Sequence, residues 1–281
     1  MNSYSPDYLI IGHMARDKIP NGAILGGTCS YAGLTARKLG QHTVAVTSFG
    51  PDIPSLATFD GLQIENVPHT GSTTFENIYE DGQRRQKWYA TAAPLSFGNV
   101  PPAWRKAPVV HLAPLAQEIS PAMCAHFKDS LLCVTVQGWL RGQDTDCNVI
   151  FKPHPELEVW LSRIDVLVLS PTDLFGDRTA MIPLLTSVRL GVETLGPEGC
   201  KVYHNGRVAH IPVKPEVEVD PTGAGDIFAA AFFIRYREGG DSIKAAQFAN
   251  ACASLSVQKV GLESIPSLAE VEAHLVELYG R

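Results

Sequence analysis

The chain has 281 residues, of which 45% are hydrophobic and 19% are charged, and its formal net charge is −6. This length suits one sizeable α/β domain or two small ones, and the acidic balance argues against nucleic acid as a partner. No apolar run is long enough for a membrane span, and the polar first residues do not resemble a signal peptide. The six cysteines show no Cys-x-x-Cys pair, so we expect reduced, mostly buried thiols in a cytoplasmic protein that has no membrane partner.

The first half of the chain alternates strand patterns with one helical pattern. Buried strands are predicted at 8–12, 43–47 and 109–112, a helix at 26–39 ended by Gly40, and a hairpin at 73–79 and 84–89 around Asp81-Gly82. A strand, a helix and a strand in that order imply a parallel crossover connection.

The second half adds further strands and then becomes helical. Strands are predicted at 132–136, 166–170 and 189–195, a hairpin at 202–204 and 207–211 around Asn205-Gly206, and helices at 224–237, 242–257 and 268–279. We therefore expect one α/β domain over residues 1–281 with a small β flap.

The most informative run is Val219-Asp-Pro-Thr-Gly-Ala-Gly-Asp226, which leads into an apolar helical stretch. Gly223 and Gly225 allow a tight turn that brings backbone N–H groups close to a ligand, and a helix start favours anions. Asp226 places a carboxylate beside this anion hole. A phosphate cradle next to a base suggests phosphoryl transfer to a hydroxyl, whereas the plainer interpretation is an Asp-capped helix start after a glycine turn.

This run resembles the C-terminal signature of the ribokinase-like (PfkB) carbohydrate kinases. The resemblance implies a three-layer α/β/α fold with a mostly parallel central sheet. It also implies that Asp226 is the catalytic base and that Gly223, Ala224 and Gly225 form the anion hole. No Walker A sequence and no Gly-x-Gly-x-x-Gly after a first strand is present, which disfavours P-loop and Rossmann proteins.

The N-terminal segment is similar to the other signature of this family. Gly12 ends a strand, Asp17 follows it, and Gly26-Gly27 opens a helix. The resemblance implies that Asp17 and Gly27, with Thr28 and Tyr31 close by, bind the acceptor, although a loop Asp that caps a turn would look the same. Many family members have Asn where this chain has Tyr31, which makes a different or less polar acceptor plausible. The short segment between Gly12 and Gly26 suggests a reduced lid, built from about 13–25 and 70–92.

Other candidate acceptor contacts lie on the flap and after the fourth strand. The flap carries polar and aromatic residues together around Asn77, and Gln137-Gly138 precedes Arg141, whose guanidinium suits a phosphate or a polar substrate. An exposed hairpin and a structural salt bridge explain these features equally well.

The resemblance assigns nucleotide and metal roles to the rest of the chain. Nucleotide contacts are implied for the Thr-Leu-Gly-x-x-Gly segment and for the later helix, namely Thr194, Gly196, Gly199, Thr222, Gly225 and Asn250. The family's Asn-x-x-Glu magnesium motif is replaced by Ser170-x-x-Asp173. Asp173 is therefore the candidate for holding Mg²⁺ through water, and it could equally cap a helix. Asp220 and Thr222 are candidates for a monovalent cation such as K⁺.

We therefore expect an ATP- and Mg²⁺-dependent kinase of a small sugar, a nucleoside or an inositol-like polyol, acting as a monomer or homodimer. The flap and the Gly-Thr-x-x-Tyr variant look more like the inositol-kinase-like branch than like ribokinase. The alternative is a catalytically weak nucleotide- or sugar-binding regulatory protein on the same fold, which the missing Asn-x-x-Glu motif favours.

Overall fold

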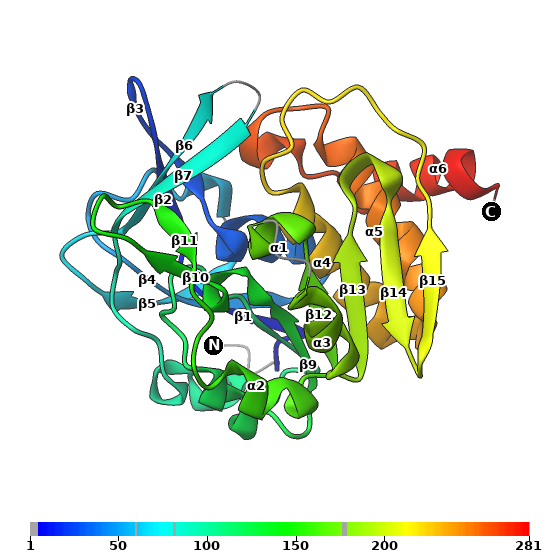
Figure 1. Cartoon of the computed structure of the whole chain (residues 1–281), viewed down its shortest axis with the longest axis horizontal. Coiled ribbons are helices and arrows are strands. Elements are labelled where there is room, and N and C mark those ends of the chain that lie inside the picture. The colour runs from blue at the N-terminus through cyan, green and yellow to red at the C-terminus, as the bar shows by residue number, and fades with distance from the viewer. Residues whose placement is uncertain (1–4, 60, 81–82, 176–178, 281) are drawn as a thin grey trace.

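The computed structural model describes residues 5–59, 61–80, 83–175 and 179–280 of the chain. Nine strands of these residues form the main sheet, in the order β15-β14-β13-β12-β9-β8-β1-β4-β5 (Figure 1). Their bounds are β1 Tyr8–Ile11, β4 Thr43–Phe49, β5 Gln63–Pro68, β8 Val109–Leu112, β9 Leu131–Thr135, β12 Val166–Leu169, β13 Leu190–Thr194, β14 Cys200–His204 and β15 Arg207–Ile211. The seven strands β13, β12, β9, β8, β1, β4 and β5 pair with their neighbours in parallel. The β14–β15 hairpin adds an antiparallel edge next to β13.

Helices cover both faces of the main sheet. The helices are α1 Thr28–Lys38, α2 Leu157–Trp160, α3 Met181–Thr186, α4 Ala224–Gly239, α5 Ser242–Ser256 and α6 Leu268–Tyr279. Tyr8 and Ile10 of β1 pack in the core that includes α1, α4 and α5, whereas Leu9 and Ile11 pack in the core on the opposite face with α3. The predicted three-layer α/β/α architecture with a mostly parallel sheet is confirmed.

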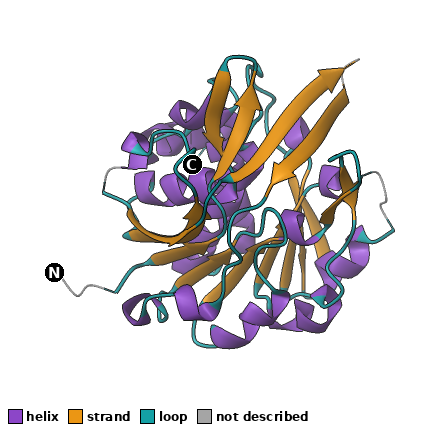
Figure 2. Ribbon diagram, turned by 90° about the vertical axis from the view of Figure 1, so that its left-hand side faces the viewer, coloured by secondary structure: helices purple, strands orange, loops and turns teal. Residues whose placement is uncertain are grey.

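A smaller four-stranded sheet stands apart from the main sheet, as Figure 2 shows. Its order is β3-β2-β6-β7, with β2 Ala15–Ile19, β3 Gly22–Gly26, β6 Thr73–Glu80 and β7 Gln83–Ala90. The β6–β7 hairpin is the one that the sequence predicts, but its turn residues 81–82 lie outside the described residues. A short pair, β10 Arg141–Gln143 and β11 Val149–Phe151, lies beside β7.

The N-terminal part of the small sheet differs from the sequence prediction. Residues 13–25 were assigned to the lid without any predicted strand, and the plainer alternative for Asp17 was a loop position. Asp17 instead lies inside β2, which pairs with β3 and with β6. Much of β2 and β3 is exposed or half-buried. A strand of this kind does not need the continuous apolar run that marks a buried parallel strand.

Glu118 fixes the junction between the two sheets. Its side chain is 4% exposed, and its carboxylate accepts hydrogen bonds from the backbone N–H groups of His13, Leu115 and Ala116 at 2.7–3.0 Å. The His13 ring in turn bonds to Thr73 at the start of β6 and to the carbonyl of Ala93 after β7. One buried carboxylate therefore holds the segment that leads into the small sheet.

We expect Glu118→Ala to lower the free energy of unfolding by about 3 kcal/mol or more, because it leaves several buried N–H groups without an acceptor. Urea denaturation of the variant measures the change. Glu118→Gln retains one carbonyl oxygen and should lose less. An unchanged unfolding midpoint for Glu118→Ala would show that the carboxylate does not hold this junction.

The cysteines and the helix lengths agree with the composition. All six cysteines are free thiols, and five of them are buried. Among the residues that the structure describes, no helix combines the length and apolar character needed to cross a bilayer.

Candidate active site

A cleft of about 480 Å³ opens where the parallel strands β9, β12 and β13 end, below the small sheet. The residues that line it come from both sheets, from the loop before α4 and from α1, α4 and α5. Every residue that the sequence analysis proposed for the site lines this cleft, with the exception of Asp220. The cleft thus brings together side chains that lie more than 200 positions apart in the chain.

The start of α4 forms the centre of the cleft. Gly223 is the N-cap, with a φ of 81°, and an added Cβ there would lie 2.2 Å from Cδ1 of Tyr31. Glycine is therefore required at this position by both backbone conformation and packing. The N–H groups of Gly223 and Gly225 have no hydrogen-bond acceptor among the described residues. Amides without an acceptor at the positive end of a helix are suited to binding an anion.

Asp226 occupies the third position of α4, half-buried at the wall of the cleft. The positive end of the helix dipole lies at this first turn and stabilises the negative charge of the carboxylate. The Tyr31 hydroxyl lies close enough to Asp17, Asp220 and Asp226 that burial, followed by these charges, raises the pKa of Tyr31. That hydroxyl is buried without a hydrogen-bond partner among the described residues, so a protonated phenol stands near the Asp17 and Asp226 carboxylates.

The two glycines before α1 make room for Asp17. An added Cβ on Gly26 would lie 2.2 Å from the Asp17 carboxylate, and one on Gly27, which has a φ of 88°, would lie 2.8 Å from the His13 carbonyl oxygen. Gly26 therefore lets the carboxylate of β2 lie across β3, and Gly27 lets α1 begin against the His13 loop. This places Asp17, Gly27 and Thr28 together on the wall of the cleft.

The small sheet and the loop after β9 supply the other polar groups on this side. Gln86 of β7 donates to Oδ1 of Asn77 across the hairpin at 2.9 Å. The Arg141 guanidinium lies 5.9 Å from the centre of the Phe75 ring. Arg141 is only 5% exposed, and its guanidinium is aligned by an aromatic face.

Asp173 is a capping residue in this structure. Its Oδ2 accepts from the backbone N–H of Ser170 at 2.8 Å, and its Oδ1 accepts from Nε2 of Gln137 at 2.7 Å. Carboxylate oxygens retain lone pairs after one hydrogen bond, so Asp173 still suits a contact to metal-bound water. No cluster of three or more His, Cys, Asp or Glu side chains suited to a metal occurs among the described residues.

The Asp220 carboxylate accepts hydrogen bonds from the backbone and does not line the cleft. One carboxylate oxygen accepts from the N–H of Thr222 at 3.0 Å and the other from the N–H of Gly261 at 3.3 Å. These bonds shape the turn before α4. They give Asp220 a structural role, and no contact of the described residues adds support to the predicted monovalent-cation site.

The residues predicted to contact a nucleotide begin at the end of β13. Thr194 ends this strand, and Gly196 and Gly199 take φ values of 58° and 89° in the turn that follows. A Cβ on Gly199 would lie 2.2 Å from the Ile211 carbonyl oxygen. Asn250 of α5 donates to that same carbonyl at 3.0 Å. Its amide nitrogen thus holds the end of β15, and the residue lines the cleft beside this contact.

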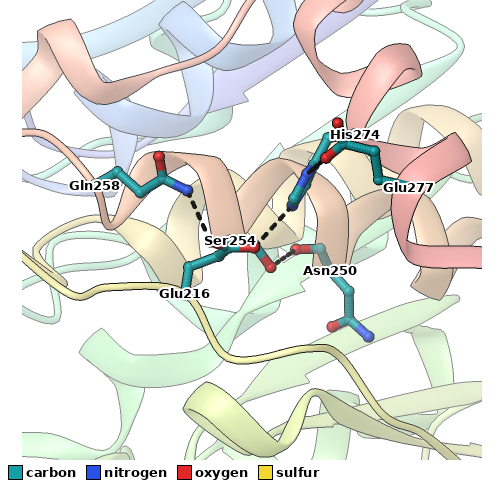
Figure 3. Close-up of polar contacts among 6 residues, drawn as sticks. All are labelled: Glu216, Asn250, Ser254, Gln258, His274 and Glu277. Carbon is teal, nitrogen blue, oxygen red and sulfur yellow. Dashed lines mark hydrogen bonds and ion pairs between the residues drawn. The ribbon is translucent and has the colours of Figure 1, made fainter.

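A loop that joins β15 to α4 forms part of the cleft wall next to these residues. Figure 3 shows Glu216 of this loop facing α5 and α6. Its carboxylate accepts from Gln258 at 3.3 Å and lies 3.7 Å from Nε2 of His274, whose Nδ1 lies 3.2 Å from Glu277. Val219 adds a backbone bond to Val257 of 2.8 Å. These contacts tie the loop to two helices.

Several cleft residues were not found by sequence reasoning. They are Leu115, Thr135, Lys214, Glu216 and Glu218, among others. Ser254 of the predicted nucleotide helix lies one helical turn after Asn250, and its hydroxyl donates to the Asn250 carbonyl. The loop residues carry no local signal, because their place depends on contacts with α5 and α6.

The charged side chains of the cleft are mostly acidic. Two cations face five carboxylates: Arg141 and Lys214 against Asp17, Asp173, Glu216, Glu218 and Asp226. Of the described residues that line the cleft, Arg141 packs over Phe75 of the small sheet, Asp17 belongs to that sheet, and Asp173 is bonded to Gln137. Such a surface favours neutral ligands with many hydroxyls over ligands with extra phosphates.

The chain is similar in sequence and in fold to known kinases. Residues 141–268 match the family model described as pfkB family carbohydrate kinase. A nucleoside kinase of Methanothermobacter thermautotrophicus is 27% identical, over 98% of this chain and 97% of its own length. An Arabidopsis thaliana ribokinase complexed with ribose and ATP superposes with a TM-score of 0.76, 21% identity and coverage of 97% of this chain and 99% of that one. A pyrophosphate-dependent kinase in the ribokinase family, complexed with a pyrophosphate analog and myo-inositol, gives a TM-score of 0.76, 19% identity and coverage of 92% and 98%.

The fold and these matches define a phosphotransferase whose acceptor is an alcohol group. Residues 141–268 carry a pfkB family carbohydrate kinase domain, and the chain as a whole is similar to carbohydrate and nucleoside kinases. The predicted family is therefore confirmed.

Proposed function

We propose that this protein is an ATP-dependent kinase that phosphorylates a hydroxyl group of a small, uncharged polyol, sugar or nucleoside. The observation that carries the proposal is the pairing of unused first-turn amides at Gly223 and Gly225 with the Asp226 carboxylate in one cleft. Acceptor recognition by Asp17, Gly27, Thr28, Tyr31, Asn77, Gln137 and Arg141 belongs to this proposal.

The reaction follows from the placement of these groups. Asp226 accepts the proton of the acceptor hydroxyl as its oxygen attacks the γ-phosphorus of ATP. The bond from the γ-phosphorus to the bridging oxygen breaks, ADP leaves, and the proton stays on Asp226 until it is released to water. The backbone N–H groups of Gly223 and Gly225 would bear the charge on the transferring group, whereas the N–H of Ala224, also predicted for the anion hole, donates to the Pro221 carbonyl at 3.2 Å.

Nucleotide binding is proposed for the far side of the cleft. Thr194, Gly196, Gly199 and Thr222 would approach the phosphates and ribose. The base would lie between the loop that carries Glu216 and the small side chains of α5 near Asn250. This room beyond the phosphate site supports a nucleotide in preference to pyrophosphate alone. Mg²⁺, held by phosphate oxygens and by water on Asp173, would neutralise the nucleotide's phosphates.

The acidic acceptor side supports a neutral acceptor. Asp17 and Asp226 can each accept hydrogen bonds from hydroxyl groups, and the Asn77–Gln86 pair presents amide groups from the flap. A phosphorylated sugar would bring a second dianion to a surface where Arg141 is the cation. We therefore expect free sugars, inositols or nucleosides to outperform their phosphorylated forms.

The test is ADP release from Mg-ATP across paired acceptors. The panel holds myo-inositol and its isomers, ribose, fructose and nucleosides, together with inositol phosphate, fructose phosphates and nucleoside monophosphates. We expect one neutral acceptor to give turnover well above background ATP hydrolysis and a far lower KM than its phosphorylated form. Turnover confined to the phosphorylated acceptors would refute the neutral-acceptor proposal, and no turnover with any acceptor would refute the kinase proposal.

A further inference from the structure

A chain of three polar side chains runs through the core beneath the cleft. The Tyr8 hydroxyl lies 2.9 Å from Nδ1 of His111, and Nε2 of His111 lies 3.0 Å from Oγ1 of Thr135. These residues come from β1, β8 and β9, which are neighbours in the main sheet. Tyr8 and His111 are fully buried, whereas Thr135 is 7% exposed and lines the cleft.

The imidazole in this chain is neutral. Burial lowers the pKa of His111 to about 3, and the Phe233 ring packs edge-on against it at 4.9 Å. A neutral imidazole carries one N–H, so it donates through one nitrogen and accepts through the other. The two hydrogen bonds that join the Tyr8 hydroxyl, the His111 ring and the Thr135 hydroxyl can therefore run in only two directions.

The two arrangements differ in which hydroxyl group keeps a hydrogen that is not donated within the chain. If Nδ1 donated to Tyr8, the Tyr8 hydroxyl hydrogen would have no acceptor among the described residues, at a fully buried position. If Tyr8 donates to Nδ1, then Nε2–H donates to Thr135, and the unshared hydrogen belongs to the Thr135 hydroxyl. That hydrogen is at the cleft, where a ligand can accept it. Because a buried donor without an acceptor is costly, the second arrangement is favoured.

Thr135 lines the cleft next to residues that are proposed to bind the acceptor. The residues that follow it in the chain lead to Gln137, which bonds to Asp173, and to Arg141, which packs against Phe75 of the small sheet. The buried chain also approaches the proposed base, because Asp226 contributes to the raised pKa of Tyr8, after burial and two cysteines.

We propose that the Thr135 hydroxyl, fixed as a hydrogen-bond donor by Tyr8 and His111, donates to an oxygen atom of the phosphoryl acceptor and helps to select it. This role rests on the proposed kinase function. It makes Thr135 a specificity-determining residue that acts beside Asp17 and Tyr31. The recognised feature is an acceptor oxygen with a lone pair directed at β9, as in a hydroxyl or a ring ether.

The experiment measures kinetics for Thr135→Val with whichever acceptor wild-type protein phosphorylates. Valine keeps the shape of threonine and removes the hydroxyl. We expect the acceptor KM to rise roughly 3- to 30-fold, as for the loss of one hydrogen bond, while kcat and the KM for ATP stay within about twofold of wild type. Thr135→Ser should restore the acceptor KM. Tyr8→Phe frees the imidazole to accept from Thr135, so it should give a smaller rise in the acceptor KM alone.

Thr43→Val is the matched control, because Thr43 is a buried threonine of β4 that does not line the cleft. It should leave both KM values unchanged. A normal acceptor KM in Thr135→Val would overturn the inference. A fall in kcat at unchanged acceptor KM would also overturn it, because the hydroxyl would then act on the base. If wild-type protein phosphorylates no acceptor, the proposed function itself fails, and the inference fails with it.

Discussion

Asp226→Asn is expected to lower kcat by about 10²- to 10⁴-fold, the usual contribution of a general base. Asparagine has nearly the same shape as aspartate but accepts a proton far less readily. Asp226 is half-buried in the first turn of α4, so the neutral side chain fits there without a packing change. We therefore expect normal folding and nearly normal nucleotide binding. Steady-state kinetics, together with nucleotide titration by calorimetry, separates the two effects.

Asp241→Asn provides the control for Asp226→Asn. Asp241 also stands at a helix start, where it caps α5 through the N–H groups of Ile243 and Lys244, and it does not line the cleft. Asparagine caps helices about as well as aspartate, so turnover should be unchanged. Near-normal turnover in Asp226→Asn would show that another group accepts the proton.

Gly225→Ala is expected to lower turnover about 10²-fold while leaving the fold intact or slightly more stable. An added Cβ at Gly225 meets no protein atom within 4 Å, and its φ is not positive. Alanine is the better helix former by about 1 kcal/mol. The methyl group would, however, project into the cleft beside the N–H groups and keep the phosphoryl group away from them. Loss of one such donor typically costs about 10²- to 10³-fold in kcat.

Two other glycines of the same helix give the contrast. Gly239→Ala, at the exposed end of α4, also meets no atom within 4 Å and should change neither turnover nor stability by much. Gly223→Ala should destabilise the protein, because its φ is 81° and its Cβ would collide with the Tyr31 ring. Thermal melting and turnover of the three variants decide the matter. Full activity in Gly225→Ala would mean that no phosphoryl group approaches these amides.

Most of the main sheet could be predicted because its strands are buried on both faces. Such strands appear as uninterrupted apolar runs, as in β1 and β12, and the Asn205-Gly206 hairpin has a turn in which both residues take positive φ values. Strands β2 and β3 gave no such signal, since their sequences are mixed and much of their surface faces solvent. The sequence therefore predicted the β6–β7 hairpin, and it assigned residues 13–25 to the lid without predicting that they form strands.

The candidate site could be predicted where the backbone itself demands a residue. Gly223 and Gly27 have positive φ values that exclude most side chains, and such requirements leave a recognisable motif. Thr135 and Glu216 could not be found in this way. Thr135 owes its proposed role to His111 and Tyr8 on neighbouring strands, and Glu216 is held by Gln258, just after α5, and by His274 of α6. Partners so distant in sequence leave no local pattern.

The most direct test of the account is ³¹P NMR of wild-type protein incubated with Mg-ATP and the best neutral acceptor. A phosphomonoester signal should grow together with ADP, and it should be absent when the acceptor is omitted or when Asp226→Asn replaces wild type. If ADP appears only with inorganic phosphate, or if ATP is bound and left unchanged with every acceptor, the protein does not transfer a phosphoryl group to a hydroxyl and the account is wrong.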